Sequence, residues 1–151
     1  MSHGTFYIIS EDAPENSKSG LLRFISNLVI SHYQQGKKIF ILADCRAQAE
    51  KIDELLWQLN PNNFIPHNLV GEGARTGSIV EIGWGDLHYS GHRNLLINLA
   101  QHAPAFAVSF SQMIDFVPCE EKSKQQARER YKMYRQAGIV LNTVDISTLT
   151  H

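Results

Sequence analysis

The sequence predicts an α/β domain, built on a mostly parallel sheet flanked by helices. Short runs rich in β-branched and aromatic residues alternate with segments of helical periodicity, the order typical of this class. Several runs are apolar at every position, which indicates strands buried on both faces, as in parallel sheets. The 151 residues, 43% of them hydrophobic, suffice for one domain with a sizeable core, which we place at 1–151.

Six segments have the length and composition of strands. They are Thr5–Ile9, Lys38–Leu42, Val80–Ile82, Leu95–Leu99, Met113–Val117 and Ile139–Val144. The segment 61–76 is expected to be a long ordered loop, because its Pro and Gly content disfavours regular structure.

The first helix is predicted from apolar residues that recur at helical spacing between Leu21 and His32. Ser17 or Ser19 could cap its start, and Gly36 is a plausible stop. The second helix is predicted to begin near Asp44 as N-cap and to end before residue 60. Its core-facing residues are Ala49, Ile52, Leu55 and Leu56.

A third helix is predicted between Glu120 and Gly138, and it concentrates positive charge. Six of the fourteen Lys and Arg residues fall between Lys122 and Arg135, opposed only by Glu129, although the whole chain has a formal net charge of -1. At about 100° per residue, one arc of this helix is cationic, with a tyrosine on its seam. That arc holds Lys124, Arg128, Tyr131, Lys132 and Arg135, and the neighbouring, core-facing arc holds Ala127, Met133, Tyr134 and Ala137.

No enzymatic motif stands out. The Gly-rich stretch 71–77 (GEGARTG) lacks the Gly-Lys-Ser/Thr ending of a phosphate-binding loop, so the fold is expected to be Rossmann-like without one. A nucleotide-binding enzyme on such a sheet remains the alternative. His88 and His92 lack acidic partners at ligand spacing apart from Asp86, and Cys45 could be a helix-terminal thiol without an assignable base. We expect no metal, no cofactor and no active site.

The chain contains no apolar run near the ~18 residues that span a membrane and no secretory signal at its start. Its two cysteines are far apart and form no CxxC. A cytoplasmic protein without membrane contact is the expectation.

The cationic helix follows an apolar step, Phe116-Val117-Pro118, at the end of a predicted strand. Ligands of open α/β sheets bind beyond the carboxyl ends of strands. Positive charge beside an apolar pocket suits a ligand that is both acidic and hydrophobic, such as a chain end with a free carboxylate, Asp residues and an aromatic ring. Direct binding of single-stranded DNA is a further alternative, but it favours a longer basic path with several stacking aromatics.

Seven stretches together resemble the chi subunit of bacterial DNA polymerase III, in that family's order and spacing. They are TFYII, DELLW, FIPHNLVGEG, VEIGW, IDFVP, KQQARERYKMYRQAG and LNT, within residues 5–143. The resemblance implies a non-catalytic clamp-loader subunit. It implies two partners, the psi subunit and the acidic C-terminal tail of single-stranded-DNA-binding protein, and leaves open a repair helicase competing for the psi site. DNA would be contacted indirectly.

The resemblance also implies roles for individual residues. Lys124, Arg128 and Lys132 would hold the carboxylates of the tail, with Arg128 on the terminal one. The pocket for the terminal Phe would be lined by Val117, Tyr131 and Trp57, and Phe64 would contact psi. The segment 144–151 follows no family pattern.

Overall fold

The computed structural model describes residues 2–58, 65–71, 78–85 and 92–149. In these ranges, seven strands form one all-parallel sheet in the order β3-β4-β2-β5-β6-β1-β7. The strands are β1 (His3–Ile8), β2 (Ile39–Ala43), β3 (His67–Leu69), β4 (Val80–Trp84), β5 (Leu95–Asn98), β6 (Gln112–Val117) and β7 (Val140–Asp145). The predicted fold class and all six predicted strands are confirmed.

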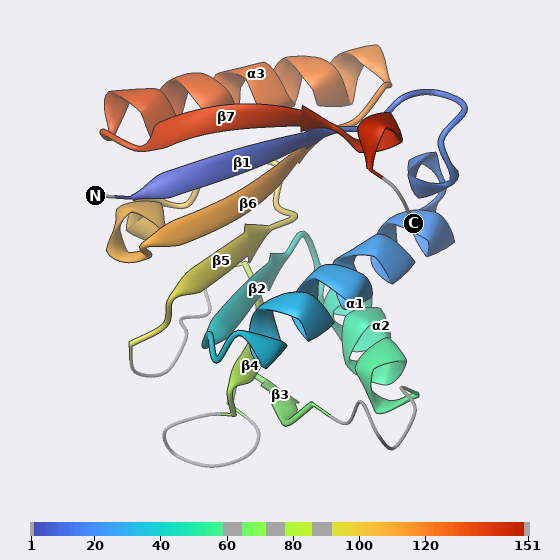
Figure 1. The fold of residues 1–151 in the computed structure, drawn as a ribbon, viewed down its shortest axis with the longest axis vertical. Helices are drawn as coiled ribbons and strands as arrows, with labels where there is room; N and C mark the ends of the chain where they lie inside the picture. The colour runs from blue at the N-terminus through green and yellow to red at the C-terminus, as the bar shows by residue number, and fades with distance from the viewer. Residues whose placement is uncertain (1, 59–64, 72–77, 86–91, 150–151) are drawn as a thin grey trace.

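Three helices cover the two faces of the sheet (Figure 1). They are α1 (Lys18–Gln34), α2 (Arg46–Trp57) and α3 (Glu121–Gln136). Alternation along β2 separates two cores, because successive side chains of a strand point to opposite faces. Ile39 and Ile41 pack with α1 and α2, whereas Phe40 and Leu42 pack in the core that contains Tyr134 of α3.

The helix starts follow local chemistry. Ser17 is the N-cap of α1, where its hydroxyl accepts a hydrogen bond from the Gly20 backbone N–H at 3.0 Å. Cys45 is the N-cap of α2, one residue later than the predicted Asp44, and its side chain makes no capping hydrogen bond. No helix within the described ranges is both long and apolar enough to cross a membrane.

The prediction of a long ordered loop without regular structure over 61–76 was wrong for three residues. His67–Leu69 form β3, which pairs in parallel with the start of β4. Buried backbone polar groups need partners, and pairing with β4 supplies them even in a strand this short. Residues 59–64, 72–77 and 86–91 lie outside the described residues, and with them Phe64, His88 and most of the Gly-rich stretch 71–77.

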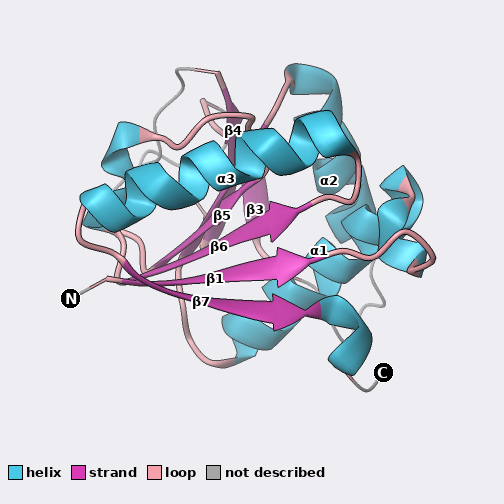
Figure 2. Cartoon of the chain, turned by 90° about the horizontal axis from the view of Figure 1, so that it is seen from above, coloured by secondary structure: helices cyan, strands magenta, loops and turns pink. Residues whose placement is uncertain are grey.

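Strand β1 lies between β6 and β7 although its partners follow it by more than a hundred residues in sequence. Ile8 pairs with Val117 of β6 and with Asp145 of β7. Figure 2 shows α3 running alongside β6, β1 and β7, and it packs on β6 and β7. This end of the sheet is therefore the platform for the cationic helix.

Candidate protein-binding surface on α3

The outer side of α3 carries three cationic side chains, Lys124, Arg128 and Lys132, which we call the cationic face. Arg128 and Lys132 are exposed, and Lys124 is half-buried. Within the described part of the chain, neither Arg128 nor Lys132 forms an ion pair with a carboxylate. The only hydrogen bond of the Arg128 guanidinium to a side chain there is a long one, 3.5 Å, to Gln125 Oε1. The charge of this face is therefore available to a ligand.

Lys124 has a weak internal partner. Its Nζ lies 3.9 Å from Glu121 Oε1, and the Glu121 side chain is 87% exposed. An ion pair this long and this solvated contributes little, so the Lys124 charge is not neutralised by it.

We use the name apolar notch for three partly exposed side chains on the α3 side of the sheet, Ile8, Val117 and Tyr131. Val117 and Tyr131 are half-buried and pack at the margin of the core beneath α3. The Tyr131 ring lies 5.2 Å from the Phe6 ring, centroid to centroid, which holds it on the seam between packed and exposed sides of the helix. Tyr131 links these apolar residues to the cationic face, because it lies three residues after Arg128 and directly before Lys132 on α3.

Ile8 was missed by the sequence analysis. Because parallel partners point to the same face and Ile8 pairs with Val117, its side chain lies on the α3 side of the sheet. It is 36% exposed, unusually open for a large aliphatic residue on a strand that is paired on both sides. Its pairing partner follows from the strand order, which only the structure supplies.

The inner side of α3 differs from the prediction in two ways. Ala127 and Tyr134 are buried as expected, but Met133 is 52% exposed and Ala137 is exposed. Met133 lies about 90° around the helix from the middle of the buried side. Arg130 takes the inner position instead, so it does not belong to the exposed charge of the helix.

Arg130 forms a buried ion pair with Asp115 of β6. Its Nε lies 3.0 Å from Asp115 Oδ2, and its Nη2 lies 3.0 Å from Asp115 Oδ1. The same carboxylate accepts from the Tyr134 hydroxyl at 2.8 Å and from Asn98 Nδ2 at 3.2 Å. We call these four residues, Asn98, Asp115, Arg130 and Tyr134, the buried network.

Burial dominates the titration of this network. It raises the pKa of Asp115, while the charge and hydrogen bonds of Arg130 act in the opposite direction. Burial also raises the pKa of Tyr134, and the neighbouring Asp115 raises it further. The phenol therefore stays protonated and donates a hydrogen bond to the Asp115 carboxylate.

A crevice of about 280 Å³ lies at the carboxyl edge of the sheet, where a nucleotide would bind in a Rossmann-like enzyme. Asn98, Asp115 and Arg130 in its lining are bonded to one another or to the backbone. Ser17, also in the lining, caps its own helix. These groups serve the protein's own structure, which does not favour the nucleotide-binding alternative.

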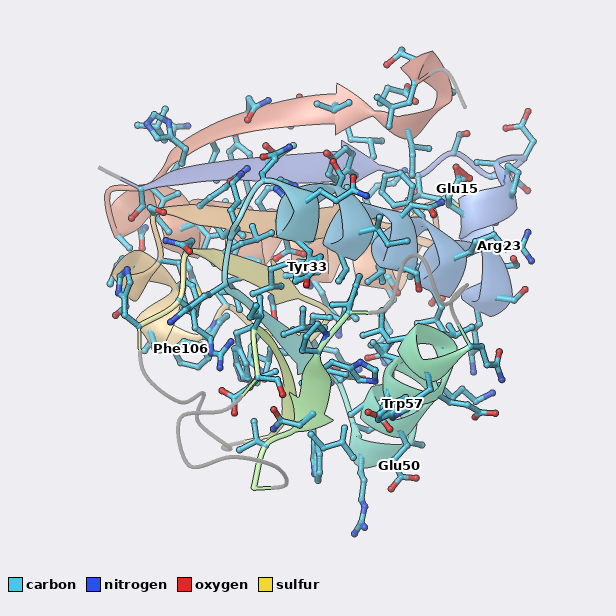
Figure 3. All side chains as sticks on the ribbon, turned by 60° about the horizontal axis from the view of Figure 1, so that its bottom comes forward. Glu15, Arg23, Tyr33, Glu50, Trp57 and Phe106 are labelled. Carbon is cyan, nitrogen blue, oxygen red and sulfur yellow. The ribbon has the colours of Figure 1, made fainter. Side chains whose placement is uncertain are left out.

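The structure does not bring Trp57 to this surface. Trp57 ends α2, which packs on β2, β3 and β4, whereas α3 packs on β6 and β7 (Figures 1 and 3). The residue is 58% exposed, and the centroid of its ring lies 4.8 Å from that of the His67 ring. The expected grouping of Trp57 with Val117 and Tyr131 is therefore corrected, since the two helices cover opposite faces of the sheet.

Comparison with known proteins places the chain in a family. The family model described as DNA polymerase III chi subunit, HolC, matches residues 1–142. The chain belongs to the DNA polymerase III chi-subunit family. The match to this chi family includes β1, β6 and all of α3, and therefore both the cationic face and the apolar notch.

Three curated chi subunits are similar over nearly their whole length. The chain is 40% identical to DNA polymerase III subunit chi of Escherichia coli strain K12 over 143 residues, 95% of this chain and 97% of the relative. It is 44% identical to the Haemophilus influenzae subunit, covering 93% and 95% of the two chains. It is 33% identical to the Pseudomonas aeruginosa subunit, covering 93% and 94%.

Proposed function

We propose that this chain is a non-catalytic subunit of the DNA polymerase III clamp-loader complex, which binds the acidic C-terminal tail of single-stranded-DNA-binding protein through α3. Membership of the chi family supports the assembly, since the curated relatives are named as subunits of that polymerase. The link would connect the replication machinery to protein-coated single strands and contact DNA only indirectly.

One observation carries the tail-binding proposal. The cationic face, with Arg128 and Lys132 free of carboxylates within the described chain, borders the half-exposed apolar notch of Ile8, Val117 and Tyr131. Carboxylates are attracted to the face, and a terminal aromatic ring can cover the notch. Trp57 is left out of this site because it lies on α2.

The size and charge of the tail determine how strongly it should bind. A short tail buries little area, so its affinity should be about micromolar. Its carboxylates should make binding weaken with salt, because exposed charges are screened. Several tails on one oligomer would raise the effective concentration and hence the overall strength.

Calorimetry with a synthetic tail peptide tests the proposal. We expect Arg128→Ala to weaken binding at least about tenfold, since a charge-assisted pair to the terminal carboxylate is lost. Lys122→Ala is the matched control, because it removes the same charge from α3 about 120° away from Arg128. Equal affinities of wild type and Arg128→Ala would refute the assignment.

We propose separately that the psi subunit binds at the region of Phe64, which lies outside the described residues. This proposal rests on the family resemblance of the stretch FIPHNLVGEG. Phe64→Ala should weaken psi capture and spare tail binding. Loss of both would indicate a folding defect rather than an interface.

A further inference from the structure

We infer that the buried ion pair between Asp115 and Arg130 is a positioning device, which fixes α3 so that the cationic face and the apolar notch meet one ligand. The inference deepens the proposed tail-binding function and rests on it. Among the described residues, Arg130 makes no hydrogen bond or ion pair to a residue of the proposed site, so it would act through the placement of other residues.

Arg130 differs from the other cations of α3 in being buried, at 7% exposure. Its guanidinium donates to three residues on two parts of the chain. Nε and Nη2 bind the Asp115 carboxylate, Nη2 also donates to the Phe116 carbonyl at 3.0 Å, and Nη1 donates to the Gln101 carbonyl at 3.1 Å. The side chain therefore ties the helix to β6 and to the segment after β5.

These contacts fix the rotation of α3. Arg128 and Lys132 lie two residues before and after Arg130, each about 200° around the helix and so on its opposite side. Tyr134 lies one turn beyond Arg130 and is anchored to the same carboxylate. With both inner residues held by Asp115, the cations at 128 and 132 must point outward.

The same contacts fix the height of α3 over the sheet. Arg130 binds the Phe116 carbonyl, and the next residue of β6 is Val117, a wall of the apolar notch. The position of the cationic face relative to Val117 thus depends on this guanidinium. A ligand whose carboxylate and aromatic ring must be satisfied together depends on that spacing.

The chemistry of the anchor suits positioning better than it suits stability. Replacing a buried ion pair by apolar residues of similar volume is often neutral or stabilising, so such a pair is weak evidence for stability. Apolar contact is non-directional and tolerates small shifts of a helix. Asp115 instead receives directed bonds from Arg130, Tyr134, Asn98 and the Phe116 backbone N–H, which define one arrangement.

The test compares two peptides, one with several Asp residues and a C-terminal Phe, and the same peptide without the Phe. The wild type should bind the first at least about tenfold more tightly, because only it fills the notch. The double variant Asp115→Leu/Arg130→Met should fold, and the preference should fall below about threefold. The salt dependence of the remaining binding should persist, because the cationic face is intact.

The preference is a ratio, so partial unfolding of a variant scales both affinities equally and cancels. Arg46→Ala/Glu50→Ala is the matched control, since it removes an ion pair of 2.8 Å from the exposed side of α2 and should leave the preference unchanged. If the double variant fails to fold, Arg130→Lys serves instead, because Lys keeps the charge but cannot make the bidentate contact. A folded variant with the wild-type preference would overturn the inference. A wild type that binds neither peptide would instead overturn the proposed function.

Discussion

Removing a single oxygen atom should destabilise the platform of α3 measurably. The Tyr134 hydroxyl donates to Asp115 Oδ2 at 2.8 Å and accepts from Asn98 Nδ2 at 2.9 Å, while the residue is 2% exposed. The substitution Tyr134→Phe deletes both hydrogen bonds and keeps the aromatic ring, including its edge contact with Phe6 at 5.8 Å. The packing of the core is therefore nearly unchanged, and the hydrogen bonds are the main loss.

The expected loss in the free energy of unfolding depends on which hydrogen bonds the Tyr134→Phe variant keeps. A hydrogen bond to a charged group contributes about 1.5–3 kcal/mol, and the Asn98 amide keeps two acceptors, Asp115 Oδ2 and the His102 carbonyl. We therefore expect the free energy of unfolding to fall by about 2 kcal/mol. For a chain of this size that corresponds to a midpoint lowered by about 4–8 °C.

Urea denaturation followed by circular dichroism measures this difference. Tyr33→Phe is the control, because the Tyr33 hydroxyl makes no side-chain hydrogen bond within the described residues, and it should cost less than about 0.5 kcal/mol. A Tyr134→Phe variant as stable as the wild type would refute the reasoning. So would equal losses in the two variants.

Two further predictions concern residues outside α3. Burial lowers the pKa of His32, and the positive charge of the Lys37 ammonium, 3.0 Å from His32 Nδ1, lowers it further. His32 therefore contributes stability that is fully present above its ordinary pKa of 6.5 and is lost as the pH falls through the lowered pKa. Lys37→Gln should raise the pKa of His32 yet leave it below 6.5, as read by proton NMR titration; no change would contradict the assigned cause. An added Cβ on Gly20 would lie 1.9 Å from the Pro14 carbonyl oxygen, so Gly20→Ala should cost more than about 2 kcal/mol in urea denaturation. Gly36→Ala should cost only about 1 kcal/mol, because the φ of 82° is unfavourable but the space is open, and the reverse order would contradict both assignments.

Much of the fold could be predicted from sequence because its signals are local. Apolar runs such as Ile39–Ala43 indicate strands that are buried on both faces. Ser17 indicates the start of a helix, because its hydroxyl can accept a hydrogen bond from a backbone N–H in the first turn. The strand β3 could not be predicted in this way. Its three residues gain their regular structure from pairing with β4, which no short window of sequence contains.

The candidate site was predictable where one helix supplies it and not where several elements meet. Helical spacing placed Arg128, Tyr131 and Lys132 together, and the structure confirms that arrangement. Arg130 was counted among the cations of this helix but assigned to neither arc, because its partner Asp115 lies fifteen residues earlier on β6. Trp57 was grouped with Val117 and Tyr131 through the family resemblance. The local sequence does not reveal that α2 covers the face of the sheet opposite to α3.

The position of β1 governs when the α3 platform can exist at all. Its two neighbours in the sheet span residues 112–117 and 140–145, so β1 leaves the ribosome long before either can pair with it. At about ten residues per second, the wait for β6 is on the order of ten seconds. The edges of β1 stay unpaired during this time, and an unpaired strand edge is prone to pair with other chains.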